Sequence, residues 1–430
     1  MNKKRFIPFV MGIIFLLFSL FSTTTVSAED LDIRAEAAIS VDYDTGKVFY
    51  EQDSDQPMGI ASVTKLISLY LIEKEIQEGN LAWEDEVPIS EDVAELSENL
   101  ELSNVPLDQN ESYTVQDLFE AAVIQSANAA TIALAEEVAG SEEAFVNQMR
   151  EQVEDWGIID AKIVNSTGLS NEYLGDNIYP GTTKEDENEL SAKDLAIVAR
   201  NLLQDFPDIL EVSRMPEKEF GEGTSTPFEM ENFNKMLPGL LSEKEDVDGL
   251  KTGTTELAGA CFVGTIEKDG NRIITVVLNA TDHDDIENEG ARFDETSKLM
   301  DYTFDHWKQE TVLAKNDSIP EMPSVAVPQG KKQTLPVAAQ DEISLWLPSD
   351  KTTDDVSYQT SLDNDEIQAP VESQTNIGTV QAQVEDDDLG YLDNEDGKSR
   401  SSSAIITTQG TEKANFFTTT WRNIKGFFSN

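Results

Sequence analysis

The chain has 430 residues, enough for two domains with separate cores, and its 39% of hydrophobic residues argues against disorder throughout. Its 83 acidic residues outnumber 31 basic ones, and the formal net charge of −52 excludes nucleic acid as a partner because phosphates would be repelled. The single cysteine, Cys261, allows no intrachain disulfide. The apolar run around it predicts a small buried residue of a strand, not a nucleophile.

The N-terminal residues have the pattern of a secretory signal. Basic residues 3–5 precede an apolar run from Phe6 to Phe21, and small residues follow up to Ala28. A membrane-spanning helix is the alternative, but the run is shorter than the roughly 20 residues that a span needs. We therefore predict an exported protein whose residues 1–28 are a signal peptide cleaved after Ala28.

A β-hairpin is expected to open the mature chain. Its strands are predicted at Ala37–Tyr43 and Lys47–Gln52, around a turn in which Gly46 supplies a positive φ. The residues from Ser62 to Ile72 are apolar nearly all round, which predicts a buried central helix that stops at Gly79.

Helices and then strands follow along the chain. The helices are predicted at Thr114–Ile124, Ala129–Ala139 and Ser191–Leu203, and the strands at Gly249–Glu256, Gly259–Glu267 and Arg272–Asn279. The first and last of these helices open with T-x-x-D and S-x-x-D, which are close to capping boxes. Strands at both ends of the region with helices between them predict an α+β domain. Its antiparallel sheet would be completed by its first and last segments, with the helices packed on it.

The C-terminal part is expected to form separate units. A boundary near Trp307 is followed by short apolar stretches divided by Pro, Gly and Asp, which predict a small all-β domain over residues 308–384. Residues 385–412 are rich in acids and serine and are predicted to be a linker.

The last residues, 413–430, predict an amphipathic helix. Aromatic and apolar residues recur there at spacings of three and four: Phe416, Phe417, Trp421, Ile424, Phe427 and Phe428. The helix is too short to span a bilayer, so we expect it to lie on the membrane surface and to anchor the protein at the outer face of the cell membrane or in the cell wall. The alternative is a terminal helix packed on its own domain.

Three short motifs suggest a catalytic site. In chain order they are Ser62-Val63-Thr64-Lys65, Ser126-Ala127-Asn128 and Lys251-Thr252-Gly253. Each is weak alone, since S-x-x-K and S-x-N should each occur about once or twice by chance in a chain of this length. Their positions carry the argument, because each lies where its chemistry would need it.

Ser62 and Lys65 lie one turn apart at the start of the predicted buried helix, so the amine can reach the hydroxyl. A serine is a poor nucleophile until a base takes its proton, and a lysine can serve if its amine is neutral. Burial and a nearby cation, for which Lys251 is the candidate, would both lower the lysine pKa. Alone, Ser62 could simply cap a helix and Lys65 could be a surface lysine.

Ser126 and Asn128 fall between two predicted helices, where both side chains could project into a cleft. Ser126 could relay a proton and Asn128 could bind a substrate amide. Helix capping explains the two residues equally well from the local sequence.

Lys251, Thr252 and Gly253 lie on a predicted strand, so regular alternation places Lys251 and Gly253 on one face and Thr252 on the other. The cation could hold a carboxylate, and Gly253 would let a substrate backbone approach the strand edge. A plain edge strand is the alternative. The backbone N–H groups of Ser62 and Thr254 are candidates for an oxyanion hole.

With these residues the chain resembles the low-molecular-weight penicillin-binding proteins, specifically the D-alanyl-D-alanine carboxypeptidases. Further matching stretches are Asn165-Ser166-Thr167-Gly168-Leu169, Ser191-Ala192-Lys193-Asp194-Leu195-Ala196, Asn232-Phe233-Asn234 and Asp248-Gly249-Leu250-Lys251. The family's layout also has a signal peptide, a β-rich second domain and a C-terminal anchor. The resemblance implies a serine peptidase domain of the penicillin-binding and β-lactamase-like transpeptidase fold over residues 29–307.

By this resemblance, Ser62 attacks the carbonyl between two terminal D-alanines of a peptidoglycan stem peptide, the last one is released, and water frees the enzyme. The resemblance implies Lys65 as the base, Ser126 as the proton relay, Asn128 as a substrate amide partner, and Lys251 and Thr252, with Gly253, as the carboxylate site. β-Lactam antibiotics such as penicillin would acylate Ser62, and no cofactor is implied.

Two other functions stay open. A β-lactamase would turn over penicillin rapidly, but Ala127 stands where class A β-lactamases have Asp, and we read the E-x-x-L-S stretch from Glu187 as coincidence. A non-hydrolysing penicillin sensor would be labelled without releasing D-alanine. No metal site is expected, because His283 and His306 are the only histidines.

Overall fold

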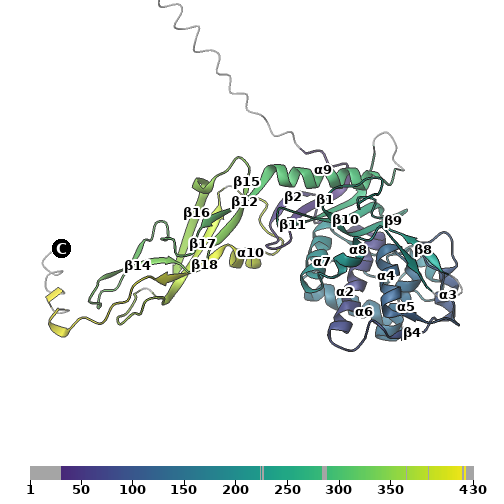
Figure 1. Ribbon diagram of the computed structural model, residues 1–430, viewed down its shortest axis with the longest axis horizontal. Helices are drawn as coiled ribbons and strands as arrows, with labels where there is room; N and C mark the ends of the chain where they lie inside the picture. The colour runs from purple at the N-terminus through teal and green to yellow at the C-terminus, as the bar shows by residue number, and fades with distance from the viewer. Residues whose placement is uncertain are drawn as a thin grey trace, which may run out of the picture. The chain divides into compact units, whose positions relative to one another are not determined.

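The computed structural model (Figure 1) describes residues 31–222, 224, 227–282, 288–364, 366–385, 387–418 and 421–422. The signal peptide predicted for residues 1–28 lies outside the described residues. The chain divides into residues 1–32 and 33–430, and the elements below belong to the second unit.

A five-stranded antiparallel sheet is the centre of the larger domain, in the order β2-β1-β11-β10-β9. The strands are β1 (Ala35–Asp42), β2 (Val48–Gln52), β9 (Val247–Thr255), β10 (Gly259–Lys268) and β11 (Asn271–Ala280). β1 pairs with β11, placing Ala37 opposite Leu278. The prediction that the first and last segments complete one sheet is confirmed, and so is the α+β fold.

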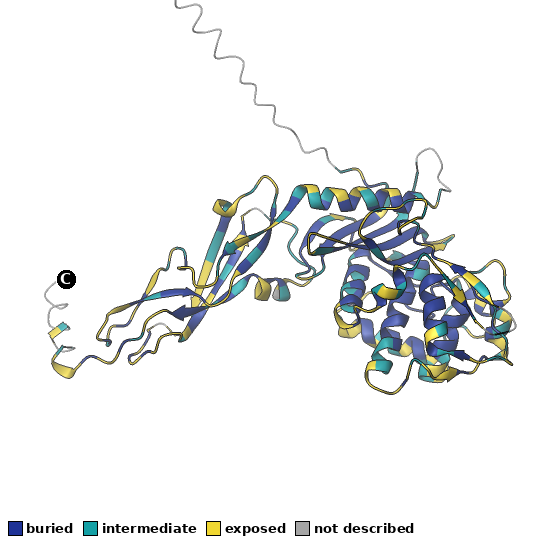
Figure 2. Cartoon of the chain, viewed as in Figure 1, coloured by how far each residue is buried: buried dark blue, intermediate teal, exposed yellow. Residues whose placement is uncertain are grey.

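Helices cover both faces of this sheet (Figure 1). They include α2 (Lys65–Gln77), α4 (Val115–Ile124), α5 (Asn128–Ala139), α6 (Glu142–Asp155), α7 (Ala192–Asp205) and α9 (Ala291–His306). α9 packs along β10 and β11 on one face, and the other five form a layer on the opposite face. Figure 2 shows the helical layer and the sheet as the most buried part of the domain. Shorter helices are α3 (Glu91–Ser97) and α8 (Ile209–Ser213).

The helix predicted from Ser62 divides into two parts. Residues Ala61–Thr64 form a 3₁₀ turn, η1, and the α-helix α2 begins only at Lys65. All residues of α2 from Lys65 to Ile72 are buried, as the apolar sequence predicted. The Ser62-Val63-Thr64-Lys65 motif therefore spans the junction between a tight turn and a buried helix.

The predicted capping boxes at the starts of α4 and α7 are present. Thr114 and Ser191 each accept a hydrogen bond from the backbone three residues on, and Asp117 and Asp194 accept in return from the backbone of the capping residues. This reciprocal arrangement satisfies N–H groups that have no partner within the helix.

Short two-stranded sheets also belong to this domain. They are formed by β3 (Met58–Gly59) with β6 (Glu189–Leu190), β4 (Glu86–Val87) with β5 (Tyr113–Thr114), and β7 (Glu217–Phe220) with β8 (Phe228–Glu231). The 3₁₀ turns η2 (Asn171–Leu174) and η3 (Thr353–Asp355) are further short elements.

The C-terminal region is β-rich, as expected. A five-stranded sheet has the order β13-β14-β18-β17-β16, and β12 pairs with β15. The bounds are β12 (Trp307–Leu313), β13 (Ser324–Ala326), β14 (Thr334–Ala339), β15 (Ile343–Pro348), β16 (Val356–Leu362), β17 (Asn376–Val384) and β18 (Ser402–Thr407). The exact domain boundaries stay predictions.

The linker predicted for residues 385–412 is wrong where it includes α10 (Asn394–Arg400) and β18. β18 lies inside the sheet, paired with both β14 and β17. Its serines suggested a linker by composition, but Ile405 and Ile406 are buried, and the Ser403 hydroxyl accepts a hydrogen bond from the Asp341 backbone.

The acidic stretch before α10 is also held in place. The buried Lys47 donates hydrogen bonds to Asp387 at 2.9 Å and to the carbonyls of Val48 at 2.7 Å and Gly390 at 3.2 Å. Its ammonium also lies 4.7 Å from the centre of the Trp307 ring. Paired charge and hydrogen bonds offset the cost of burying this lysine.

The predicted location at the outer face of the membrane, through an anchoring helix over residues 413–430, is corrected. Lys413 forms a β-bridge with Gly330, so no helix begins there. Helical geometry is described only at residues 416–418 and 421–422, and residues 423–430 lie outside the described part. Within the part of the chain that the structure describes, no helix has the length and apolar character needed to cross a bilayer.

Candidate active site

Ser62 and Lys65 lie in hydrogen-bonding contact at the junction of η1 and α2. The Lys65 side chain is fully buried, and its Nζ donates to Ser62 Oγ at 2.9 Å. The same atom donates to Asn128 Oδ1 at 2.7 Å and to the Thr167 carbonyl at 2.9 Å. The structure thus brings together the nucleophile and base that the sequence predicted.

The environment of Lys65 favours a neutral amine. Burial, followed by the positive charge of Lys251, lowers the Lys65 pKa well below its usual value. A neutral amine has two N–H donors and one lone pair. If the two donors bind Asn128 and Thr167, the lone pair is directed at Ser62 Oγ, which is the geometry that a general base needs.

Ser126 and Lys251 form a second hydrogen-bonded pair. Lys251 Nζ donates to Ser126 Oγ at 2.8 Å and to the Thr252 carbonyl at 3.1 Å. Burial, and next the nearby Arg292, lower the Lys251 pKa to about 7. Ser126 has a φ of 55°, a left-handed conformation that costs energy for a residue with a side chain. The strain marks this turn between α4 and α5 as a constrained position.

A cavity of about 540 Å³ opens in front of these pairs, lined by Ser62, Ser126 and the β9 residues Thr252, Gly253 and Thr254, among others. Strand β9, which carries Lys251, Thr252 and Gly253, therefore borders the same cavity as Ser62 and Ser126. Lys251 is only 3% exposed and its amine is hydrogen-bonded to the cavity-lining Ser126, whereas Thr252 lines the cavity itself. Of the residues predicted to bind a substrate carboxylate, Thr252 thus borders the cavity directly and Lys251 does not.

Gly253 has a structural reason to lack a side chain. A Cβ at this position would lie 2.7 Å from the Ile60 carbonyl oxygen and 3.0 Å from the Val63 nitrogen. β9 therefore packs directly against η1, which carries Ser62. This close approach of two backbones was not anticipated from the sequence, which suggested contact with substrate instead.

Both polar atoms of the Asn128 side-chain amide form hydrogen bonds within the protein. Oδ1 accepts from Lys65, and Nδ2 donates to the Ser103 carbonyl at 2.9 Å. The residue is 2% exposed. The geometry gives it a contact to the base, and the predicted contact to a substrate amide stays untested, as do the oxyanion roles of the Ser62 and Thr254 N–H groups.

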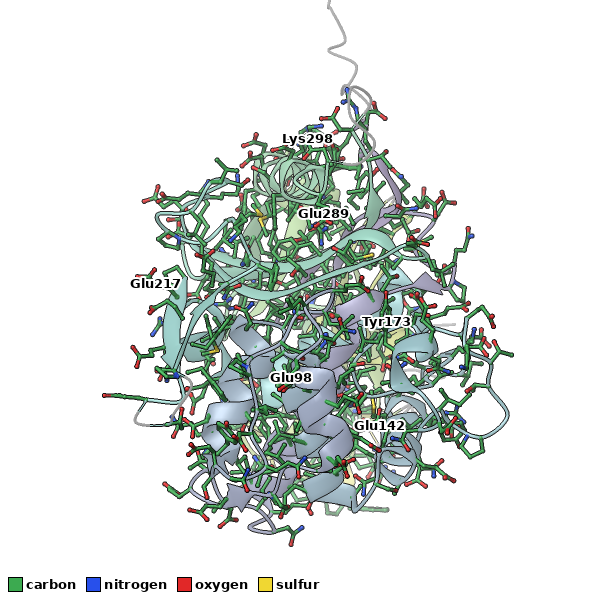
Figure 3. The ribbon with its side chains drawn as sticks, turned by 90° about the vertical axis from the view of Figure 1, so that its right-hand side faces the viewer. Glu98, Glu142, Tyr173, Glu217, Glu289 and Lys298 are labelled. Atoms are coloured by element: carbon green, nitrogen blue, oxygen red, sulfur yellow. The ribbon has the colours of Figure 1, made fainter. Side chains whose placement is uncertain are left out.

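Arg292, at the start of α9, is a functional candidate that sequence reasoning missed. Its guanidinium donates to the Gly253 carbonyl at 2.8 Å and to Thr254 Oγ1 at 2.7 Å, and it also contacts Glu289 at 3.1 Å. Arg292 and Glu289 both line the cavity. Figure 3 shows Glu289 on the same face of the domain as Glu98, which lines an adjoining cavity. No local motif surrounds Arg292, so only the fold reveals it.

The turn at residues 165–168 is the other missed contribution. Asn165 Oδ1 accepts hydrogen bonds from the backbone of Thr167 at 3.1 Å and of Gly168 at 2.7 Å, which closes the turn. The Thr167 carbonyl then points at Lys65. The N-S-T-G-L stretch was noted as a family resemblance, but a backbone carbonyl carries no side-chain signal for its role.

Glu187, which begins the E-x-x-L-S stretch, contacts the end of strand β9. Its carboxylate accepts a hydrogen bond from Thr255 Oγ1 at 2.6 Å, and burial raises its pKa. This contact holds Thr255, the last residue of β9, which follows Lys251, Thr252 and Gly253 along the strand.

The fold and site define a serine peptidase of the penicillin-binding class, and comparison with known proteins agrees. Residues 22–282 match the peptidase S11 family, described as D-alanyl-D-alanine carboxypeptidase, and residues 307–402 match the C-terminal domain of penicillin-binding protein 5. The chain belongs to this D-alanyl-D-alanine carboxypeptidase family.

Individual relatives cover most of the chain. The D-alanyl-D-alanine carboxypeptidase DacF of Bacillus subtilis is 27% identical over 392 residues, covering 90% of this chain and 89% of that protein. A peptidoglycan synthesis regulatory factor, PBP3, of Streptococcus pneumoniae is 40% identical, with a TM-score of 0.73 over 88% of this chain and 100% of its own. Penicillin-binding protein D2 of Listeria monocytogenes, solved in an ampicillin-bound form, is 28% identical, with a TM-score of 0.52 over 64% of this chain and 99% of its own.

Proposed function

We propose that this protein is a serine-type D-Ala-D-Ala carboxypeptidase that removes the terminal D-alanine from peptidoglycan stem peptides through an acyl-enzyme on Ser62. The observation that carries the proposal is the Lys65 amine, fully buried and 2.9 Å from the Ser62 hydroxyl. Membership of the carboxypeptidase family supports the substrate class.

Acylation follows from this arrangement. Lys65 takes the Ser62 proton as Oγ attacks the carbonyl carbon between the two D-alanines. The N–H groups of Ser62 and Thr254 would receive the oxyanion. The C–N bond then breaks, and the leaving amine takes a proton from Lys65 through Ser126. An ester on Ser62 and free D-alanine result.

Deacylation uses the same base. Lys65, again neutral, takes a proton from a water molecule that attacks the ester. The shortened peptide leaves with a new carboxylate, and Ser62 recovers its proton. The carboxylate of the terminal D-alanine would lie at Thr252 and Thr254, where the positive charges of Lys251 and Arg292 converge on β9.

Penicillin binding is part of the proposal. The β-lactam carbonyl would be attacked by Ser62 in the same way, giving a covalent adduct. Slow hydrolysis of that adduct would distinguish a peptidase from a β-lactamase.

The test measures free D-alanine released by the purified full-length protein from a peptide ending in two D-alanines. We expect release by the wild type and a loss of at least about 1,000-fold in Ser62→Ala, because the nucleophile is gone. Ser170→Ala is the control and should retain activity, because Ser170 does not line the cavity and its hydroxyl donates only to the Lys184 carbonyl.

Two outcomes would contradict the proposal. Rapid, repeated hydrolysis of penicillin with no release of D-alanine would indicate a β-lactamase. Stable penicillin labelling at Ser62 without any release of D-alanine would indicate a sensor.

A further inference from the structure

Glu142, in the first turn of α6, holds a residue next to the catalytic lysine's backbone partner. Its Oε1 accepts a hydrogen bond from the Ser166 backbone N–H at 2.7 Å, and its Oε2 accepts from Ser166 Oγ at 2.9 Å. Both carboxylate oxygens are therefore committed to one residue. Such a bidentate arrangement fixes both the position and the orientation of that residue.

Ser166 is fixed from the other side as well. Its carbonyl accepts a hydrogen bond from Ser68 Oγ at 2.6 Å, and Ser68 lies one turn after Lys65 on α2. The next carbonyl along the chain, that of Thr167, accepts from Lys65 Nζ at 2.9 Å. The path from Glu142 to the base thus consists of two hydrogen-bonded steps through one short backbone segment.

We propose that Glu142 is a positioning residue for the reaction: as a carboxylate it holds the Ser166–Thr167 peptide so that the Thr167 carbonyl orients the Lys65 amine toward Ser62. The inference rests on the proposed function, because it assigns Lys65 as the base. Glu142 itself touches neither Ser62 nor Lys65 and acts only through Ser166.

The surroundings of Glu142 make its ionisation state variable near neutral pH. Burial raises its pKa to about 7, although the two Ser166 hydrogen bonds oppose the shift. A cavity of about 400 Å³ adjoins it, and Figure 3 marks Glu142 and Tyr173, which both line this cavity. The other ionisable groups lining it are Asp92 on α3, Glu136 on α5, Glu143 on α6 and Asp176, and none of these is a cation.

Protonation weakens the contact to Ser166. A carboxylate accepts from both the Ser166 N–H and the Ser166 hydroxyl through charge-assisted hydrogen bonds. A carboxylic acid can still accept from the N–H and donate to the hydroxyl oxygen, but both bonds are then between neutral groups and are weaker. The hold on Ser166 is therefore strongest when Glu142 is ionised. An isosteric Gln can accept from the Ser166 N–H and donate to Ser166 Oγ, but without a negative charge it holds Ser166 more weakly than the carboxylate does.

The test measures acylation of the full-length protein by a fluorescent penicillin between pH 6 and pH 8. For Glu142→Gln we expect the maximal acylation rate to fall roughly three- to tenfold at pH 8, with little change in the concentration giving half-maximal rate, because no substrate contact is lost. The ratio of wild-type to variant rate should grow from pH 6 to pH 8 as Glu142 ionises.

Further variants separate positioning from folding. Glu143→Gln changes the same charge on the neighbouring residue and should leave acylation unchanged. Ser166→Ala removes one of the two donors and should give a smaller loss that is not additive with Glu142→Gln. The unfolding midpoint of Glu142→Gln at pH 8 should not fall, because a carboxyl whose pKa is raised to about 7 destabilises the folded protein once it is ionised.

The experiment distinguishes failure of the Glu142 role from failure of the proposed carboxypeptidase function. A wild type that is not acylated at all would overturn the carboxypeptidase assignment itself. An acylated wild type whose Glu142→Gln variant reacts at the same rate, or with a rate ratio independent of pH, would overturn the role of Glu142 alone.

Discussion

Two buried lysines in the site have opposite requirements. In the proposed mechanism, Lys65 must be neutral to accept the Ser62 proton, whereas Lys251 can hold a substrate carboxylate only while it is charged. Burial lowers both pKa values, and the charge of Lys251 lowers that of Lys65 further. Each lysine therefore depends on the ionisation of the other.

This dependence predicts a bell-shaped pH profile for kcat/KM with the peptide substrate. The rate should rise as Lys65 loses its proton and fall above about pH 7 as Lys251 loses its own. The falling limb should move to higher pH in kcat, because a bound carboxylate favours the charged form of Lys251. Steady-state rates between pH 5 and pH 10 would check this. A falling limb retained in Lys251→Gln would contradict the assignment.

At the scale of elements, the turn at residues 165–168 and η1 lie in direct contact. A Cβ on Gly168 would lie 1.8 Å from the Ala61 carbonyl oxygen, and Gly168 has a φ of 80°. Ala61 also has a positive φ, of 48°. Two constrained backbones thus meet next to Ser62, which limits how far Ser62 and the hydrogen-bond partners of Lys65 can move apart.

We expect Gly168→Ala to be strongly destabilising, by about 3 kcal/mol or more, since both the clash and the backbone conformation oppose the methyl group. Penicillin acylation should fall with it. Gly157→Ala is the matched control, because Gly157 has the same φ of 80° and its Cβ would meet nothing within 4 Å. Its cost should be only about 1 kcal/mol. Equal unfolding midpoints for the two variants would refute the close contact as the cause.

Much of the fold could be predicted because local and global signals agree. The Thr114 and Ser191 caps, the apolar residues of α2 and the β-branched strands each encode their own structure. β18 was missed because its serines suggested a linker, while its pairing with β14 and β17 depends on residues far away in sequence. Composition over a window cannot reveal such a partner.

In the site, too, residues within local motifs could be predicted, whereas contributions that depend on the fold could not. Ser62, Lys65, Ser126 and Lys251 carry motifs and were found, and the structure brings them together. The contribution of Thr167 comes from a backbone carbonyl, which every residue has, so no side chain could reveal it. Arg292 was missed for another reason, because its position beside Thr254 depends on how α9 packs on the sheet.

For the whole molecule, the net charge of −52 predicts a marked effect of salt on stability. Like charges repel more in the compact state than in the unfolded one, and salt shortens the distance over which they act from about 10 Å at 0.1 M to about 3 Å at 1 M. The unfolding midpoint should therefore rise with sodium chloride. Thermal unfolding with sucrose of equal osmolarity is the control, and a midpoint that falls with salt would argue against the repulsion.

The pairing of β1 with β11 also governs how the protein acquires its structure. Because Ala37 of β1 pairs with Leu278 of β11, almost the whole peptidase domain has to be synthesised before β1, already paired with β2, can pair with β11. Closing so large a loop is slow, and until then the free edge of β1 can pair with other chains. A fragment that ends before β11 should therefore aggregate even if its helices form normally.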